Sequence, residues 1–473
     1  MKRLALRLRV HLALSRAAPV LALLGIAACT FTNTLDVCER EPPPAEGPLT
    51  DARDGIELSG PRAAVAMPSA GALVFFIRTV VEGTNIRASL LASRVETDGG
   101  RSRACQRFPL AVPYASTDGL TSLVNAAAAA PAVAAATSFG LVAVARVVSG
   151  TAGNFVESRL VGVTFDGEGC PVLERSDGSP ALFDLGDETA GEGVLGSPTV
   201  LRLDDNRFVV AWASGSLIDF RAQARLVELR RGLAPVLSPI VTLDRGPISA
   251  LAMAALGDGR LAFAWQRAAF PDAFILLEIW SDTLEPIPAL ERQFLARVEA
   301  VTMLGDDARI TLGFDGGQLL AAWTAREPGA ALRINARFRG LNGEPFVSVD
   351  APDGLAFRPS DNIAGEELNP VIAAVPGGGL VLAWEEHGLP SSPSDRIRAA
   401  AFDAAGRRQF LNASCGTAPI AVSTAGDRIF IEPALVFVGE RTLVSTWSAF
   451  ERDSPAGQVQ ARVFAPEQLF PID

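Results

Sequence analysis

The chain has 473 residues, with 49% hydrophobic and 20% charged residues and a formal net charge of −11. An acidic surface of this kind repels phosphate backbones, so nucleic acid is not an expected partner. The only histidines are His11 and His387, which weighs against a multi-histidine metal centre and makes any Ser-His-Asp arrangement depend on one residue. We expect neither a metal nor a cofactor.

Residues 1–28 are predicted to form a signal peptide. Five basic residues precede an apolar run from Pro19 to Ala28, which is shorter than the ~20 residues needed to span a bilayer. The run ends directly before Cys29, and this ending resembles the lipobox of bacterial lipoproteins. The resemblance implies that Cys29 becomes a lipidated N-terminus and that the partner of this end is a membrane. The alternative is a plain signal peptide followed by a chance cysteine.

Two further expectations follow from the leader. By the same resemblance, Thr30 after the lipidated cysteine implies an outer-membrane location, with periplasmic or surface exposure left open. Loss of five basic residues takes the net charge of the mature chain from −11 to about −16. Residues 29–50 contain four prolines and are predicted to form an extended tether, which leaves residues 51–473 for the folded body.

Four cysteines remain after Cys29. In an exported protein they allow two disulfides with three possible connectivities, and the sequence does not choose among them. The positions are Cys38, Cys105, Cys170 and Cys415.

A short apolar stretch ending in tryptophan recurs along the body. The first copy is Phe208–Trp212, and five of the six tryptophans stand at the end of such a stretch. A repeat of this kind fixes architecture before chemistry is considered. We predict that these tryptophans are core residues rather than sugar platforms. The copies end at Trp212, Trp265, Trp323, Trp384 and Trp447.

Each repeat unit has the same order of strands and turns. A short strand, often begun by proline, leads through a Gly- or Asp-rich turn into the tryptophan stretch, and a third and a weaker fourth strand follow. Two earlier units keep this order without the tryptophan. We therefore predict an all-β protein: a seven-bladed β-propeller of four-stranded antiparallel blades. The pattern resembles uncharacterised repeat-containing lipoproteins of Gram-negative bacteria, and no functional residues come with that resemblance.

The last unit ends soon after its third strand. We predict that Gly55–Ser59 supplies the missing strand and closes the ring, with Ile56 near Arg462, because closure removes exposed strand edges. The recurring arginines of the third strands, Arg159, Arg225, Arg337 and Arg462, are predicted to be structural hydrogen-bond donors.

The loops between second and third strands are long and differ from unit to unit, which is typical of binding surfaces. Tolerated insertions are the alternative. Glu385-Glu386-His387 is the one place where a histidine lies beside acids. A solvated loop tip is the favoured interpretation, and a general acid/base or metal-binding role is the alternative. The acidic pair Asp204-Asp205 could gather a cation but matches no calcium-loop pattern. Candidate binding-face residues are Arg267, Arg326, Glu327, Glu385, Glu386, His387 and Arg452.

The favoured function is a membrane-anchored envelope lipoprotein whose propeller binds or scaffolds a protein, peptide or glycan through these loops. The first alternative is a propeller hydrolase or lyase that uses carboxylates at the central channel. A purely structural role in an envelope complex is the second alternative.

Overall fold

The computed structural model shows an all-β protein. It describes residues 47–48, 61–67, 71–82, 85–98, 101–103, 132–136, 140–151, 154–166, 170, 172, 182–186, 193–215, 220–230, 233–269, 271–299, 309–326, 331–349, 351–360, 365–388, 395–409, 419–423, 428–440, 442–451 and 457–464. Within these ranges every regular element is a β-strand. No helix in this part of the chain is long and apolar enough to cross a membrane.

The described strands form seven antiparallel sheets, which we number in chain order. Sheet 1 contains β2 (Pro61–Met67), β3 (Gly71–Glu82), β4 (Asn85–Glu96) and β5 (Arg101–Arg103). Sheet 2 contains β6 (Ala132–Ala136), β7 (Gly140–Thr151), β8 (Asn154–Phe165) and β9 (Phe183–Asp184). Sheet 3 contains β10 (Gly193–Arg202), β11 (Arg207–Gly215), β12 (Phe220–Arg230), β13 (Leu233–Leu237) and β14 (Val241–Arg245).

The second half of the chain repeats this plan. Sheet 4 contains β15 (Ile248–Ala255), β16 (Arg260–Ala269), β17 (Asp272–Ser281) and β18 (Gln293–Glu299), and sheet 5 contains β19 (Ile310–Phe314), β20 (Leu319–Arg326) and β21 (Leu332–Arg339). Sheet 6 contains β22 (Glu366–Ala374), β23 (Leu380–His387), β24 (Arg396–Phe402), β25 (Arg408–Gln409) and β26 (Ile420–Ala421). Sheet 7 contains β27 (Arg428–Val438), β28 (Thr442–Glu451), β29 (Gly457–Phe464) and β1 (Gly47–Pro48).

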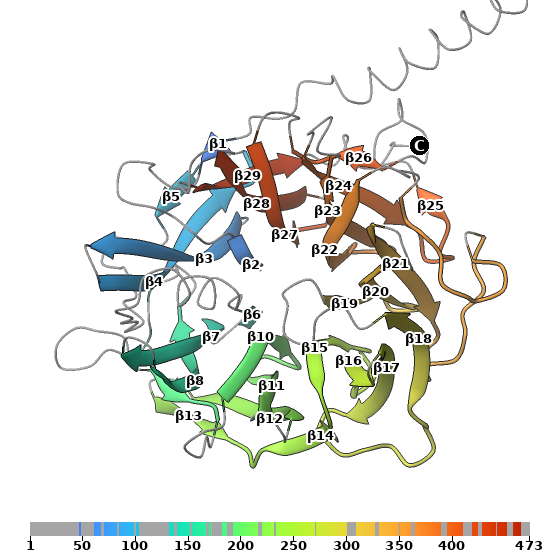
Figure 1. The fold of residues 1–473 in the computed structure, drawn as a ribbon, viewed down its shortest axis with the longest axis horizontal. Helices are drawn as coiled ribbons and strands as arrows, with labels where there is room; N and C mark the ends of the chain where they lie inside the picture. Colours follow the sequence, from blue (N-terminus) through green and yellow to red (C-terminus); the bar gives the residue numbers. More distant parts are fainter. Residues whose placement is uncertain are drawn as a thin grey trace, which may run out of the picture.

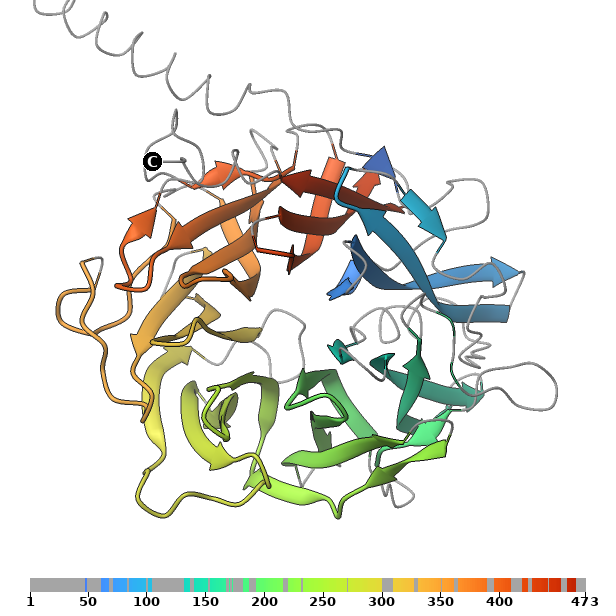
Figure 2. The same ribbon diagram turned by 180° about the vertical axis from the view of Figure 1, so that it is seen from behind.

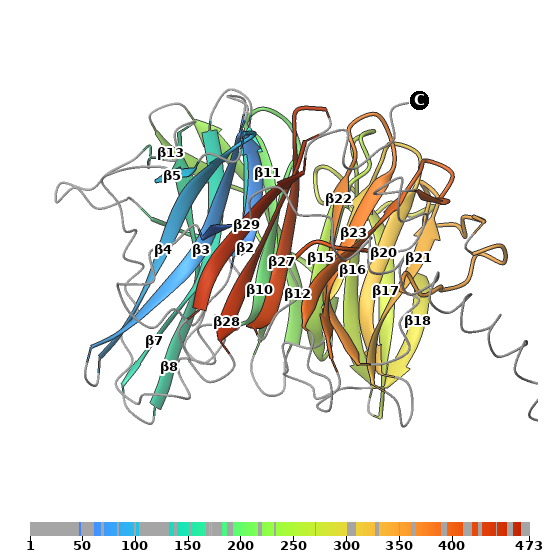
Figure 3. The ribbon, with the colours of Figure 1, turned by 90° about the horizontal axis from the view of Figure 1, so that it is seen from above.

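The sheets are arranged around a common centre, with the first strand of each sheet innermost (Figure 1). Neighbouring first strands lie beside one another, and β2 of sheet 1 lies beside β27 of sheet 7. The view from behind shows the same arrangement (Figure 2). Seen from above, the strands run between two faces of the molecule (Figure 3). We call the face with the turns between first and second strands the turn face, and the face with the connections between second and third strands the loop face.

The tryptophans pack between sheets, as predicted. Trp212, Trp265, Trp323, Trp384 and Trp447 are each at most 1% exposed. Trp323 packs with β17 residues of sheet 4, and Trp384 packs with β20 and β21 residues of sheet 5. The second strands of sheets 3 to 7 are therefore buried on both faces, which explains why they are apolar at successive positions rather than at alternate ones.

The expectation of four strands in every unit needs a correction. In sheets 3 and 6 the fourth strand is split into two pieces that pair with the same third strand. Sheet 5 has three described strands, and among the described residues its outer edge makes the isolated bridges Ala336↔Phe357 and Arg339↔Pro345 in place of a fourth strand. In sheet 3 the split lies at Ser238-Pro239, where proline has no N–H to donate and the Arg225 guanidinium donates to the Ser238 carbonyl at 2.6 Å.

Three of the four recurring arginines donate hydrogen bonds to backbone carbonyls, which confirms for them the predicted structural role. Arg225 Nη1 donates to the Leu185 carbonyl and Arg337 Nη1 donates to the Leu295 carbonyl, both at 2.6 Å, and Arg462 donates to the Val422 carbonyl. In each case the acceptor lies in or beside the outer strand of the preceding sheet. The side chain of Arg159 lies outside the described residues.

The N-terminal segment contributes a strand to the last sheet. Gly47 and Pro48 pair with Ala461 and Gln460 of β29. The sequence prediction placed this strand at Gly55–Ser59, which lies outside the described residues, so the pairing that is described lies eight residues earlier in the chain. Cys170 is disulfide-bonded; the other predicted cysteines, with Cys29, lie outside the described residues.

Candidate functional site

The structure places the predicted binding-face residues on three different sheets. Arg267 lies in β16, Arg326 ends β20, and Glu385, Glu386 and His387 end β23. Arg267 forms an ion pair with Asp244 of sheet 3 at 3.7 Å, while Arg326 is exposed. They are therefore not brought into one cluster. Glu327 and Arg452 lie outside the described residues.

His387 is held between two carboxylates. Its Nε2 lies 3.0 Å from Glu385 Oε2, and its Nδ1 lies 3.4 Å from Asp395 Oδ1. Burial alone would lower the pKa of the imidazole, but the hydrogen bonds and charges of Asp395 and Glu385 outweigh it and raise the pKa to about 10. Both ring nitrogens then carry protons at neutral pH, so the ring has no lone pair with which to act as a base. The favoured interpretation of a solvated loop tip is wrong here, because Glu385 and Asp395 are buried.

Glu385 connects sheet 6 to sheet 7. Its side chain is 1% exposed, and its Oε1 accepts from Asn369 Nδ2 at 2.5 Å and from the backbone N–H of Glu432. One buried carboxylate therefore holds the histidine with one oxygen and two neighbouring first strands with the other.

Those first strands are bulged at the contact. The register shifts between Leu368 and Val371 in β22, and between Ile431 and Ala434 in β27. Asn369 and Glu432 stand directly before the prolines in these bulges, with φ of +50° and +56°. A left-handed backbone in a non-glycine residue costs about 1–3 kcal/mol and persists where its surroundings hold it. The shared oxygen of Glu385 is part of that support.

The Glu432 side chain reaches a third sheet. Its Oε1 lies 2.9 Å from Nη2 of Arg309, the residue that precedes β19 in sheet 5. The Glu432 side chain is 8% exposed and that of Arg309 is 23% exposed. The first strands of sheets 5, 6 and 7 thus share one polar cluster at the ends from which these strands begin, on the loop face. We call Arg309, Asn369, Glu385, His387, Asp395 and Glu432 the loop-face cluster.

The opposite side of sheet 6 carries a second pair of acids. Glu386 lies 3.4 Å from Arg396 Nε and 3.3 Å from Arg398 Nε. Its cross-strand neighbour Glu367 is 1% exposed and accepts from the backbone N–H of Ile334 in sheet 5 at 3.2 Å. Burial is the largest cause that raises the Glu367 pKa. The Ile334 N–H lies in the part of β21 that has no described fourth strand beside it. The Glu367 carboxyl group therefore accepts the hydrogen bond that a backbone carbonyl of a fourth strand would otherwise accept.

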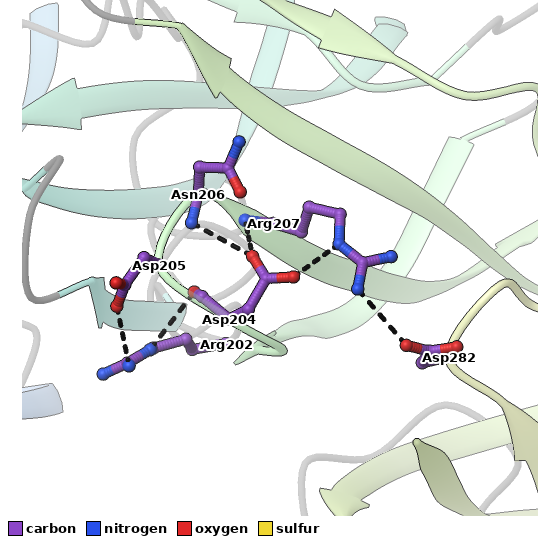
Figure 4. Close-up of polar contacts among 6 residues, drawn as sticks. All are labelled: Arg202, Asp204, Asp205, Asn206, Arg207 and Asp282. Carbon is purple, nitrogen blue, oxygen red and sulfur yellow. Dashed lines mark hydrogen bonds and ion pairs between the residues drawn. The ribbon is translucent and has the colours of Figure 1, made fainter.

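The turn face uses its polar groups for a different purpose. The Asp204 carboxylate accepts from the backbone N–H groups of Asn206 and Arg207 at 3.1 and 2.9 Å and from Arg207 Nε at 2.6 Å (Figure 4). Arg207 then reaches Asp282 of the next sheet at 3.3 Å, and Arg202 pairs with Asp205. These contacts occupy the groups that the sequence suggested for a cation.

The same device recurs in the next two units. The turn residues Asp258 and Asp315 hold Arg260 and Gln318, which donate at 2.6 Å to Asn342 and to the Asp403 carbonyl of the following sheet. In sheets 3, 4 and 5, polar side chains of these turns therefore join neighbouring sheets.

Sequence reasoning missed Arg309, Asn369 and Glu432. The only available signal was a polar residue directly before the proline that begins a first strand, in Asn369-Pro370 and Glu432-Pro433. Within the part of the chain that the structure describes, no group of three His, Cys, Asp or Glu residues could hold a metal ion.

Comparison with known proteins adds little. No family model and no curated protein matches the chain. Among solved structures, a Dyadobacter fermentans protein of unknown function aligns over 89% of this chain and 99% of its own, with 8% identity and a TM-score of 0.44. A Penicillium chrysogenum α-L-arabinanase aligns over 72% and 94%, with 11% identity and a TM-score of 0.41. A Bacteroides thetaiotaomicron endo-arabinase aligns over 72% and 95%, with 11% identity and a TM-score of 0.31. At TM-scores below 0.5, these likenesses carry no argument about this chain.

Proposed function

We propose that this protein is a membrane-anchored envelope lipoprotein with a seven-bladed β-propeller that binds a protein, peptide or glycan on its loop face. In this proposal the seven sheets are the blades, and the N-terminal strand closes the ring. The observation that carries it is the loop-face cluster, in which charged and amide side chains of sheets 5, 6 and 7 contact one another on the loop face.

The contrast between the two faces supports this proposal. On the turn face, Asp, Arg and Gln side chains connect one sheet to the next in successive units. The loop-face cluster instead joins sheets 5, 6 and 7, and it contains two non-glycine residues with left-handed backbone. Strained backbone of this kind is typical of functional sites.

The state of His387 favours binding over acid/base catalysis. A general base needs an unprotonated nitrogen near neutral pH, and the two carboxylates that contact this ring hold its pKa about three units above neutrality. The ring therefore stabilises the cluster as a fixed cation.

Binding can be tested with the full-length chain on peptide and glycan arrays. We expect a ligand whose binding is weakened by Arg267→Glu or Arg326→Glu on the loop face. The matched control is Arg202→Glu, which reverses a charge on the turn face. A ligand that responds equally to all three substitutions would contradict a loop-face site.

The lipid anchor has a separate test. Cys29→Ala removes the thiol that would carry the lipid, so the variant should leave the membrane pellet, whereas Cys38→Ala should remain in it. A Cys29→Ala variant that stays in the pellet refutes the lipoprotein assignment and leaves the binding site untouched.

A hydrolase or lyase is the second candidate, and Glu367 is the observation that favours it. Its raised pKa is a property of general acids, although its side chain is buried against Ile334. Release of reducing ends from a polysaccharide by the wild type, lost in Glu367→Gln, would establish catalysis.

A further inference from the structure

Arg309 and Glu432 form an ion pair across three sheets at the centre of the molecule. Arg309 precedes the first strand of sheet 5, and Glu432 lies in the first strand of sheet 7. Between these two strands lies β22 of sheet 6, whose bulge contains Asn369. The first strands β19, β22 and β27 are neighbours around the common centre (Figure 1). The pair therefore lies where a ligand on the loop face would reach the middle of the ring.

The bulges of sheets 6 and 7 bring two first strands to one carboxylate. Each bulge contains a non-glycine residue with positive φ, which is a costly backbone conformation. These bulges place the Asn369 amide and the Glu432 backbone N–H on the same Glu385 oxygen.

The surroundings make the pair rigid. Glu385 uses one oxygen for the two bulges and the other for His387, which is fixed in turn by Asp395. Residues whose positions are set by a second layer of hydrogen bonds are pre-organised for recognition. Arg309 is the more accessible member of the pair, with 23% of its side chain exposed.

The charges restrict the class of ligand. The loop-face cluster contains three carboxylates, one guanidinium and one imidazolium, so an anionic ligand would meet a local excess of negative charge. A cationic ligand would meet Arg309 first. A neutral ligand with several hydroxyl groups avoids both charge penalties, because a guanidinium donates hydrogen bonds to hydroxyl oxygens and the adjacent carboxylate accepts hydrogen bonds from hydroxyl groups.

We propose that Arg309 and Glu432 are the contact pair of a site for an uncharged oligosaccharide. This inference rests on the proposed binding function and narrows its ligand class. Asn369, Glu385 and His387 are positioning residues, since they act by holding the pair in place.

The test is calorimetric titration of the full-length chain, purified in detergent, with uncharged gluco-, galacto-, xylo-, manno- and arabino-oligosaccharides. We expect at least one series to bind, and Arg309→Met and Glu432→Gln to weaken that binding by about 10-fold or more. The first substitution removes the guanidinium donors, and the second removes the negative charge that strengthens hydrogen bonds from ligand hydroxyl groups. The control is Arg297→Met, which removes the guanidinium of an exposed Arg–Asp pair in sheet 4 and should change the affinity by less than about 2-fold.

A folding defect is separated from a binding defect by measuring the thermal unfolding midpoint of each variant. If Arg309→Met does not fold, Arg309→Lys takes its place in the titration. Lysine keeps the charge but lacks the planar guanidinium, so this variant should still weaken binding. Polygalacturonate serves as the acidic probe, and we expect it to bind more weakly than the best uncharged series.

The outcomes separate this inference from the proposed function. Binding of peptides or polygalacturonate alone overturns the oligosaccharide assignment and leaves a binding module. Oligosaccharide binding that Arg309→Met and Glu432→Gln do not change overturns the contact pair. Absence of any ligand for the wild type overturns both proposals.

Discussion

Replacement of His387 by glutamine tests the central electrostatic feature of the loop-face cluster. The imidazole is held between Glu385 and Asp395, which raise its pKa to about 10 from an ordinary value of 6.5. Glutamine has a similar reach and can donate to one carboxylate, but it carries no charge. The variant therefore removes the ion pairs while it retains part of the packing.

The sign of the pH dependence follows from proton linkage. Between pH 6.5 and about 10 the folded chain keeps the proton and the unfolded chain has lost it, so the stabilisation is fully present below pH 6.5 and declines as the pH rises towards 10. Each pKa unit corresponds to about 1.4 kcal/mol, which sets an upper limit of about 5 kcal/mol. Because a fifth of the side chain is exposed and water screens the pair, we expect about 2–4 kcal/mol.

Two assays measure this effect. Urea unfolding at pH 6, 8 and 9.5 gives the free energy of unfolding, and the difference between wild type and His387→Gln should shrink as the pH rises. In the mature chain His387 is the one histidine after the predicted leader, so its NMR titration can be assigned directly. A titration midpoint near 6.5, or a difference in stability that does not depend on pH, would refute the reasoning.

Three further predictions concern stability. Glu367→Ala should lower the free energy of urea unfolding by about 1–3 kcal/mol, because the buried Ile334 N–H loses its acceptor. Glu367→Gln keeps an acceptor and should be at least as stable as wild type at pH 8, since the raised pKa of Glu367 makes its ionisation unfavourable in the folded chain. Equal losses of stability for both variants would contradict this prediction. Arg337→Met should lower the free energy of unfolding by about 1.5–3 kcal/mol, because two backbone carbonyls lose the guanidinium that donates to them. A loss below about 0.5 kcal/mol would show that the arginine is dispensable. Asp204→Ala should lower the free energy of unfolding by about 1–2 kcal/mol, because two backbone N–H groups of the turn lose their acceptor. Arg202→Ala in the same turn should lower it by less than about 1 kcal/mol. A larger loss of thermal stability for Arg202→Ala than for Asp204→Ala would contradict the turn geometry.

The propeller-like order of strands was predictable because it depends on local signals. The copies ending in tryptophan, the Gly- and Asp-rich turns and the prolines at first strands identify the elements without any long-range contact. Burial of the five tryptophans followed from apolar residues at successive positions of the second strands. The split fourth strand of sheet 3 was not predicted, since it depends on the Arg225 guanidinium occupying the gap at Ser238.

The candidate site was predictable only in part. Glu385, Glu386 and His387 attracted attention as the one histidine among acids. Their surroundings were misjudged, because nothing local shows that the end of β23 is covered by Asp395 and by the first strand of sheet 7. Arg309 and Glu432 are 123 residues apart in the chain, and no spacing rule connects them.

The amino-acid sequence by itself determined the all-β class, the repeat, the burial of its tryptophans and the structural role of three of its recurring arginines. These properties follow from periodicity and turn chemistry, which act over a few residues. Tertiary structure alone decided that Arg309, Asn369, Glu385 and Glu432 meet, that two pre-proline residues take up left-handed backbone, and that His387 carries a fixed charge. The physical reason is that pKa values, ion pairs and strained bulges depend on which sheet lies next to which, and that arrangement exists only once the sheets have packed around their common centre.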